Sequence, residues 1–242
     1  MNWTSILCAA AAATALGAVG PGFAEATTAG AAPRTFVYSV VHSRYGGIGV
    51  YQRTIEDAEG VTRARSKLDI TVKMMGMVVH RERDDQTEVW RDGRLVSFSS
   101  VSDSQGHQLV VNGQASGGRF QITTPSGVTY APADLSAADP WGLQHVGAGE
   151  VVSIKSGKVN HVVVVGGGTE QITIAGVAMA VRHFSASTET QPDKWDVWVD
   201  RAGVPVRFRS REGESTVDFT LVSPAPQAAS DPPAQTRRAK GE

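Results

Sequence analysis

Apolar and polar residues alternate with a period of two over much of this chain of 242 residues. The segments 67–74, 119–123 and 216–221 each carry an apolar residue at every second position. Because successive side chains of a strand point to opposite faces, each segment predicts a strand with one apolar and one polar face. Such strands are typical of antiparallel sheets with one face in contact with solvent.

Turn-forming residues recur at short intervals between these segments, for example at Gly46-Gly47, Asp92-Gly93 and Glu212-Gly213. This spacing predicts a meander of roughly twelve strands. So many half-apolar strands must curl around their apolar face or divide into two sheets. We therefore predict a mainly β fold: an antiparallel meander curled into a half-barrel or open barrel, with one short helix or irregular capping segment.

One hairpin pattern occurs twice, at 88–98 and at 196–208. Both copies run acidic residue, Val, Trp, any residue, Asp, a turn with Gly, and then Val and Phe on the returning strand. Asp92-Gly93 predicts a tight type I′ turn, because both residues tolerate positive φ. The longer turn from Asp200 to Gly203 predicts a type I turn closed by a left-handed glycine.

Two registers are open for the second hairpin. The first opposes Val197 with Val206 and Asp196 with Arg207, which gathers the apolar residues of both strands on one face. The second is bulged at Gly203 and shifted by one residue. The face pattern favours the first, unbulged register.

The segment 131–149 breaks the alternation and separates the two parts of the meander. Pro132 is predicted to open a short helix there, and Pro140 to end it. We expect this segment to cap the mouth of the curled sheet. Leu135 and Trp141 would then lie over an interior space large enough for an acyl chain, with the apolar strand faces as its walls.

Residues 1–26 have the form of a secretory signal peptide, with a short Ala-rich apolar run and small residues at Ala24 and Ala26. The start of this segment lacks the usual Lys or Arg. We predict cleavage after Ala26 and a periplasmic or secreted protein. The single cysteine, Cys8, lies in this segment, so the mature chain would carry no thiol.

The remaining chain divides into a predicted single β domain at 34–222 and a tail at 223–242. The domain is long enough to bury a substantial core. The tail is rich in Pro, Ala, Gln and Ser and is predicted to be disordered.

Composition narrows the possible partners. Without Glu25 the chain has 23 basic and 23 acidic residues, and they form no basic stripe of the kind that binds nucleic acid. No apolar run after the signal segment is long enough to cross a bilayer. We expect a monomer that binds no nucleic acid and has no transmembrane segment in its mature form.

A possible metal site is the cluster of Met74, Met75 and Met77 with His80, because thioethers and imidazole can hold copper. The favoured interpretation is core packing, since Met74 continues an apolar strand face and methionine fills irregular space beside Gly76. The histidines also lack zinc-binding spacings. We therefore predict no metal and no cofactor.

Signatures of common enzymes are absent from the sequence, including the Gly-x-Ser-x-Gly elbow and the Ser-x-x-Lys motif. Asp92 and Asp200 could in principle form an acid and base pair. Each is better explained as a turn residue whose carboxylate accepts backbone N–H groups. No catalytic residue is predicted, and the chain is more consistent with a binding protein than with an enzyme.

The chain resembles an uncharacterised family of secreted bacterial β-proteins, known as a domain of unknown function. The likeness covers most of 35–222 and gives no functional residue to carry over. It rests on Ile48-Gly49, Leu68-Asp69-Ile70-Thr71-Val72 running to Gly76, Trp90 with Asp92-Gly93-Arg94-Leu95, and Trp198-Val199-Asp200 with Gly203. A more distant similarity to periplasmic lipoprotein carriers implies a half-barrel that encloses a lipid-binding cavity.

Three functions follow from this reading, in order of preference. The first is a non-catalytic binding or carrier protein for an apolar or amphipathic, lipid-like ligand. The second is a structural or protein-interaction module of the cell envelope, which would dock through exposed strand edges. The third is a hydrolase with an unrecognised site. For the first function we predict ligand contacts at Leu135, Trp141, Trp90 and Trp198.

Overall fold

The computed structural model describes residues 32–143, 145–188 and 195–224. The predicted signal peptide, and the predicted tail from residue 225 onward, lie outside the described residues. The described part is a single sheet of fifteen strands with one short helix, α1 (Pro140–Leu143). The strands are β1 (Arg34–His42), β2 (Gly46–Ala58), β3 (Val61–Met74), β4 (Met77–Arg91), β5 (Arg94–Ser104), β6 (His107–Ser116), β7 (Arg119–Thr124), β8 (Gly127–Pro132), β9 (Ser136–Ala137), β10 (Ala148–Val152), β11 (Val159–Ile174), β12 (Val177–Thr188), β13 (Trp195–Val199), β14 (Pro205–Glu212) and β15 (Ser215–Ser223).

The strand order is β8-β7-β6-β5-β4-β3-β2-β1-β15-β14-β13-β12-β11-β10-β9. Strands that follow one another along the chain are therefore neighbours, and β1 and β15 pair at the centre of the sheet. Within the described residues every pairing is antiparallel except that of β9 with β10. The predicted antiparallel meander is confirmed, with fifteen strands in place of the expected twelve. The segment expected to be irregular contributes β9 and part of β10.

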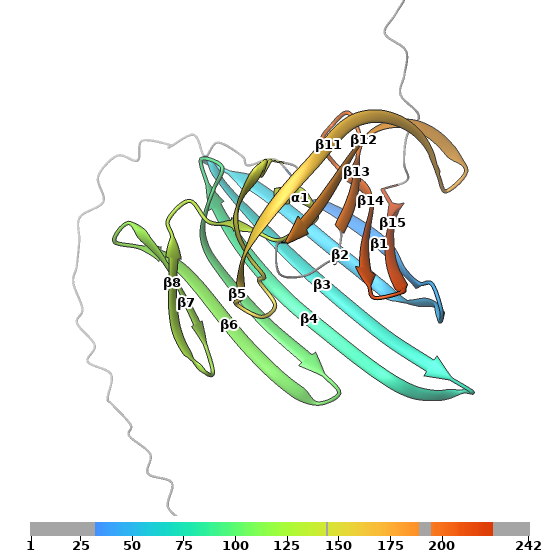
Figure 1. The fold of residues 1–242 in the computed structure, drawn as a ribbon, viewed down its shortest axis with the longest axis horizontal. Helices are drawn as coiled ribbons and strands as arrows, with labels where there is room; N and C mark the ends of the chain where they lie inside the picture. The colour runs from blue at the N-terminus through green and yellow to red at the C-terminus, as the bar shows by residue number, and fades with distance from the viewer. Residues whose placement is uncertain (1–31, 144, 189–194, 225–242) are drawn as a thin grey trace, which may run out of the picture.

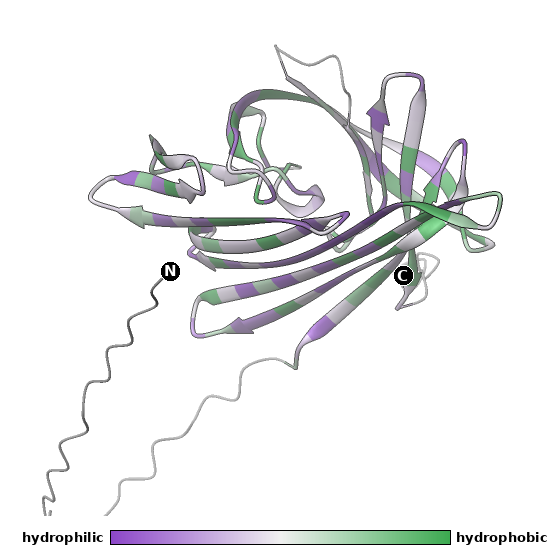
Figure 2. Ribbon diagram, turned by 90° about the horizontal axis from the view of Figure 1, so that it is seen from below, coloured by the Kyte–Doolittle hydropathy of each residue, from purple (hydrophilic) through white to green (hydrophobic). Residues whose placement is uncertain are grey.

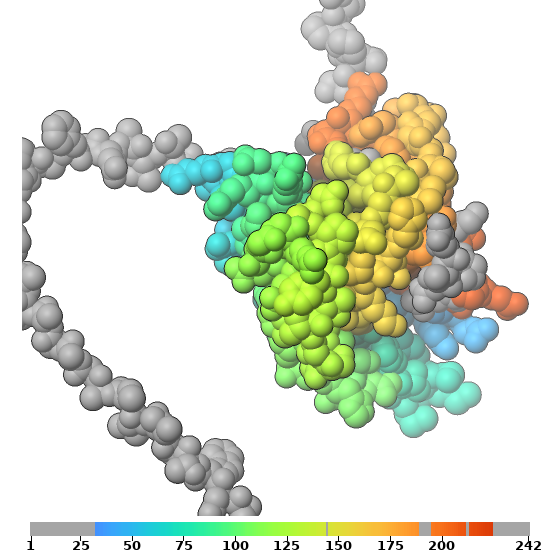
Figure 3. Space-filling model, turned by 60° about the vertical axis from the view of Figure 1, so that its left-hand side comes forward, coloured from blue at the N-terminus to red at the C-terminus, as the bar shows by residue number. Residues whose placement is uncertain are grey.

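The sheet curls without closing, as the fold prediction required (Figure 1). Hydrophilic and hydrophobic residues alternate along its long strands (Figure 2). Figure 3 shows the chain that follows β8 packed directly against β6 to β8. One core cluster joins the two edges, since Phe98 and Phe120 of β5 and β7 pack with Leu135 and Val152.

A second core cluster lies at the centre, around β1. Tyr38 of β1 is fully buried, and its hydroxyl donates a hydrogen bond of 2.7 Å to the Pro205 carbonyl oxygen. Its ring contacts those of Tyr51, Trp141 and Phe208, at centroid distances of 5.2 to 5.9 Å. This contact ties the capping segment to the middle of the sheet.

The helix of the capping segment begins at Pro140, which corrects the prediction that Pro140 would end it. Proline suits the first helical position because its missing N–H has no partner there in any case. Asp139 is the N-cap: its Oδ1 accepts hydrogen bonds from the backbone N–H groups of Trp141 and Gly142, at 2.7 and 3.0 Å. The sequence signal of an acidic cap followed by proline was present but was assigned to the wrong end of a helix.

The second Trp hairpin adopts neither predicted register over its length. Val197 pairs with Phe208, and Trp198 with Arg207, so the unbulged register with Val197 opposite Val206 is wrong. The predicted turn itself is present: Gly203 has φ of 82°, and the Asp200 carboxylate accepts hydrogen bonds from two backbone N–H groups of the turn. A further irregularity then shifts the register between Trp198 and Val199.

Candidate functional site

The interior of the curled sheet is divided by the segment Asp139–Leu143, which contains α1. We call the space on one side the outer chamber, lined among others by Ile55, Ala64, Trp90 and Trp141. It has a volume of about 940 Å³. Its mouth is formed by the β2–β3, β4–β5 and β13–β14 turns, which lie at the same end of the strands.

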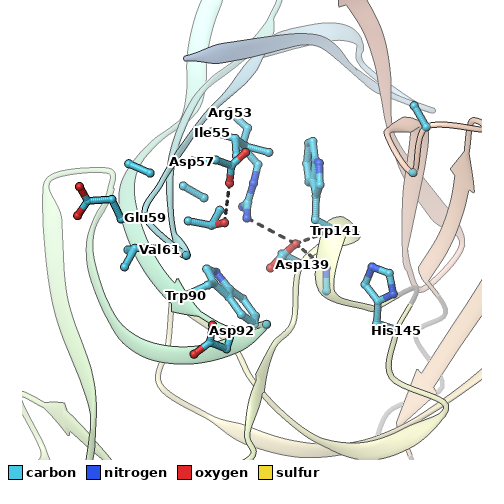
Figure 4. Close-up of a pocket in the computed structure, with 18 residues that line it drawn as sticks. Arg53, Ile55, Asp57, Glu59, Val61, Trp90, Asp92, Asp139, Trp141 and His145 are labelled. Carbon is cyan, nitrogen blue, oxygen red and sulfur yellow. Dashed lines mark hydrogen bonds and ion pairs between the residues drawn. The ribbon is translucent and has the colours of Figure 1, made fainter. Parts of the chain in front are cut away.

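The outer chamber has two tryptophan walls. Figure 4 shows Asp139 between the rings of Trp90 and Trp141. Trp141 is held from behind by Phe36 and Tyr38, at centroid distances of 5.9 Å to each ring. Trp90 is oriented by its indole N–H, which donates a hydrogen bond of 3.0 Å to Glu88. Two of the four predicted ligand-contact residues therefore line one chamber.

A buried ion pair forms the floor of the outer chamber. The guanidinium of Arg53 donates two hydrogen bonds to the carboxylate of Glu88, at 3.0 and 3.1 Å. It also lies 3.9 Å from Asp139 and 4.7 Å from the centre of the Trp141 ring. Because both partners of the pair are buried, their hydrogen bonds fix the geometry more firmly than a surface pair would.

Two groups of this floor have hydrogen-bonding capacity to spare, because Arg53 Nε and one carboxylate oxygen of Asp139 are both buried without a hydrogen-bond partner among the described residues. Burial raises the pKa of Asp139 to about 6, the Arg53 guanidinium opposes this shift, and the Glu88 carboxylate adds to it. Within the described residues its Oδ2 has no hydrogen-bond partner, whereas its Oδ1 caps the helix. A buried oxygen of this kind is able to bind a donor supplied from outside the chain.

The inner chamber lies on the other side of the α1 segment, and it has a volume of about 510 Å³. Its apolar lining includes Leu68, Leu143, Val197 and Phe208. Leu68, Val197 and Phe208 come from strand faces that the alternation predicted to be apolar, and Leu143 comes from α1. Lys155 adds a charged group at this chamber, where it pairs with Glu82 of β4.

The other two predicted contact residues lie elsewhere. Leu135 is buried in the cluster that joins the two edges of the sheet, and it lines a separate groove of about 520 Å³ beside Trp90. The Trp198 ring is stacked on His183 at 4.6 Å, and its indole N–H is bonded to Glu170. Trp198 lines neither chamber, although it is largely buried as its apolar area requires.

The methionine cluster is not part of the core, which corrects the favoured interpretation. Met74, Met75 and Met77 are all exposed at the tip of the β3–β4 hairpin. Met75 and Gly76 form a two-residue turn with positive φ, so no kink in the core is present for the methionines to fill. Among the described residues no group of three or more His, Cys, Asp or Glu side chains is arranged to hold a metal ion.

Sequence reasoning missed Arg53, Glu88 and Asp139, which form the floor of the outer chamber. A signal for Arg53 was present, because it occupies the inward phase of β2 between Tyr51 and Ile55. A charged residue in the apolar phase of a strand indicates a buried partner. The identity of that partner depends on the curl of the sheet and is not encoded in local spacing.

The fold and the chambers define an open, curled antiparallel β protein with an interior cavity. The chain belongs to the family described as Domain of unknown function (DUF6134), which matches residues 40–222. No curated protein matches the chain in sequence. Within the described residues no helix is long and apolar enough to cross a membrane.

A solved structure has a similar fold. It is the beta-barrel-like protein of domain of unknown function DUF1849 from Brucella abortus, with a TM-score of 0.58 and 10% sequence identity. The alignment covers 78% of this chain and 95% of that chain. At this identity the likeness establishes a shared fold, in agreement with the curled sheet described above.

Proposed function

We propose that the protein is a non-catalytic binding or carrier protein for an amphipathic, lipid-like ligand, exported to the periplasm or secreted. The observation that supports it most is the outer chamber, where two tryptophan walls meet a buried carboxylate oxygen without a partner. Ligand pockets in proteins have this composition: mostly apolar walls, a few convergent polar groups and a volume of 300 to 1,000 Å³.

Each part of the chamber would contact a different part of the ligand. The rings of Trp90 and Trp141 offer large, rigid apolar surfaces, and each methylene buried between them would contribute about 0.8 kcal/mol. Asp139 Oδ2 would accept a hydrogen bond from a hydroxyl, amide or ammonium group of the ligand. The Arg53–Glu88 pair holds this arrangement in place before the ligand arrives, which reduces the entropic cost of binding.

The proposal is tested by binding of a neutral apolar fluorophore, N-phenyl-1-naphthylamine, to the purified protein. Ala58→Trp places an indole at the mouth of the outer chamber, where Ala58 is exposed. We expect this variant to weaken binding at least tenfold. The matched control is Ala138→Trp, which adds the same ring at an exposed position of the inner chamber and should leave the affinity within twofold.

Native mass spectrometry and lipid extraction of protein purified from its own host give a second test. We expect a bound species whose extracted ligand has an apolar body and a hydrogen-bond donor. Weaker binding by Ala138→Trp alone would move the site to the inner chamber. A single unliganded mass, no extracted lipid and no fluorophore binding would contradict the carrier function.

The second candidate, an interaction module of the cell envelope, is favoured by the edge strand β8. Val128 and Tyr130 of this strand are exposed, and among the described residues no strand pairs with β8 on the side away from β7. Such an edge can accept a strand from another protein. Replacing Val128 with Lys would abolish partner binding of this kind and leave fluorophore binding unchanged.

A further inference from the structure

The β3–β4 hairpin projects beyond the rest of the sheet at the end opposite the outer chamber. The pairing of β2 with β3 ends at Gly49 and Ile70, and that of β4 with β5 ends at Glu82 and Ser104. Residues 71–80 therefore have strand partners only within the hairpin, and Gln105 of the β5–β6 turn donates hydrogen bonds to the carbonyl oxygens of Arg81 and Val79. Figure 1 shows this tip extending past the neighbouring hairpins.

The projecting tip is strongly apolar and open to solvent. Met75 is 95% exposed, Met77 66% and Met74 50%, and Val78 and Val79 are 48% and 42% exposed. The five apolar residues that flank Gly76 are thus all exposed to solvent. Contiguous exposed apolar surface on a soluble protein marks a site of interaction.

The tip ends in a tight turn. Met75 and Gly76 have φ of 51° and 80°, as in a tight two-residue turn, and Met74 pairs directly with Met77. Within the hairpin each strand bonds to the other through its inward-facing groups, and its outward-facing N–H and C=O groups need water or polar headgroups. The backbone of the tip therefore suits the polar interfacial region of a bilayer and not its hydrocarbon core.

The charges around the tip are positive. Between Lys73 and Arg81 there is no acidic residue, and both of these cations are exposed. The exposed acids further back on the strands have cationic partners, since Asp69 lies 3.2 Å from Arg83 and Asp85 lies 3.7 Å from Lys67. Cations behind an apolar tip complement a surface of anionic lipid headgroups.

The apolar tip is continuous with the interior of the protein. Met74, Val72 and Ile70 alternate along one face of β3 and lead to Leu68, which lines the inner chamber. Val72 of this row is buried in a core cluster with Val40 and Ile48, so the exposed tip stands on a packed apolar base. Thioether side chains also adapt readily to a disordered apolar phase.

We infer that the β3–β4 hairpin inserts its Met74-Met75-Gly76-Met77 tip into the interfacial region of an anionic lipid bilayer. Lys73 and Arg81 then lie at the level of the phosphate groups, and the tip side chains lie among the upper parts of the acyl chains. This inference rests on the hairpin alone, so it stands whether or not the outer chamber binds a ligand.

The test is co-sedimentation of the purified protein with vesicles of phosphatidylglycerol and phosphatidylcholine, compared with phosphatidylcholine alone. We expect the protein to bind the anionic vesicles and Met75→Glu to reduce the bound fraction at least tenfold. Met75→Leu should restore it. The matched control is Gln108→Glu, which adds the same charge to an exposed position on the neighbouring β5–β6 hairpin and should lower binding less than threefold.

Folding does not confound this test, because Met75 is almost fully exposed and its replacement should leave the unfolding midpoint unchanged. Three results would overturn the inference. The first is that the wild-type protein does not bind anionic vesicles, and the second is that Met75→Glu and Gln108→Glu weaken binding equally. The third is that Met75→Glu abolishes a concentration-dependent dimer formed without lipid, which would make a second copy of the chain the partner of the tip.

Discussion

A single buried arginine organises the floor of the outer chamber. Arg53 is paired with Glu88 through two hydrogen bonds and approaches Asp139, so one cation faces two carboxylates. Removing two carboxylates and a guanidinium from water is costly. The single positive charge of Arg53 cannot offset the desolvation cost of both carboxylates fully. The acid with the weaker contact, Asp139, is the one whose pKa rises to about 6.

This arrangement makes stability depend on pH through Asp139. Its pKa rises from an ordinary value of 3.8 to about 6 on folding, so between these values the folded state holds more protons than the unfolded state. The folded state is therefore favoured at low pH, and that contribution is lost as the pH rises through about 6. The difference between the two pKa values corresponds to roughly 3 kcal/mol of unfolding free energy.

Asp139→Asn should remove this dependence and keep the helix cap, because the Asn side-chain oxygen can accept the same two backbone N–H groups. We expect the free energy of unfolding of the variant, relative to that of the wild type, to rise by up to about 3 kcal/mol as the pH increases from 4 to 7. Urea unfolding across this range measures it. Asp134→Asn, at an exposed position, is the control and should follow the wild type; a parallel pH profile for Asp139→Asn would contradict the assignment.

At the scale of the elements, the β13–β14 hairpin shows how two local shifts combine. The turn closes with Asp200 opposite Val204, one residue away from the unbulged register. A second shift between Trp198 and Val199 moves the pairing by one more residue, so that Val197 meets Phe208. Because side chains alternate with period two, two shifts of one residue return both strands to the faces that the sequence pattern indicated.

Cysteine pairs in this hairpin report its register, since the single native cysteine lies in the predicted signal segment. We expect a disulfide from Val197→Cys with Phe208→Cys or from Asp196→Cys with Arg209→Cys. One of two adjacent pairs has the close, non-hydrogen-bonded geometry that a disulfide needs. Non-reducing electrophoresis measures the yield, and preferential crosslinking of Val197→Cys with Val206→Cys would contradict the observed register.

At the scale of the whole molecule, the first and the last of the described strands, β1 and β15, pair at the centre of the sheet. Because β1 pairs with β15, the two edges β8 and β9 are consecutive in sequence and are linked by three residues. The curl brings these edges together and leaves the α1 segment inside. The fold thus makes an interior of two chambers from one continuous meander, with the outer chamber and the methionine tip at opposite ends.

The N-terminal segment predicts that the protein is cleaved when it is exported. We expect the exported protein to begin at Thr27, because Ala24 and Ala26 present the small side chains that signal peptidase accepts. Intact mass spectrometry of periplasmic or secreted material measures this. Ala26→Arg should block the cleavage, while an intact Met1 in the wild type, or fatty acyl chains on Cys8, would contradict it.

The sequence by itself determined the strands, their faces and the antiparallel meander, because alternation and turn chemistry are local properties. It also identified Trp141 as a candidate because it lies in the segment expected to cap the sheet, and Trp90 because an indole ring can stack on a ligand. It placed Pro140 at the wrong end of α1, because proline both starts and stops helices. Exposure of the methionines was missed because the length of a hairpin relative to its neighbours is not a local property.

Only the tertiary structure decided the site. Arg53, Glu88 and Asp139 lie on β2, on β4 and before α1, and no spacing in the sequence links them. The curl of the sheet and the inward course of the capping segment bring them together and divide the interior into two chambers. The amount of curl follows from twist accumulated over fifteen strands and from packing between distant edges. Neither contribution can be predicted from the sequence of a single segment.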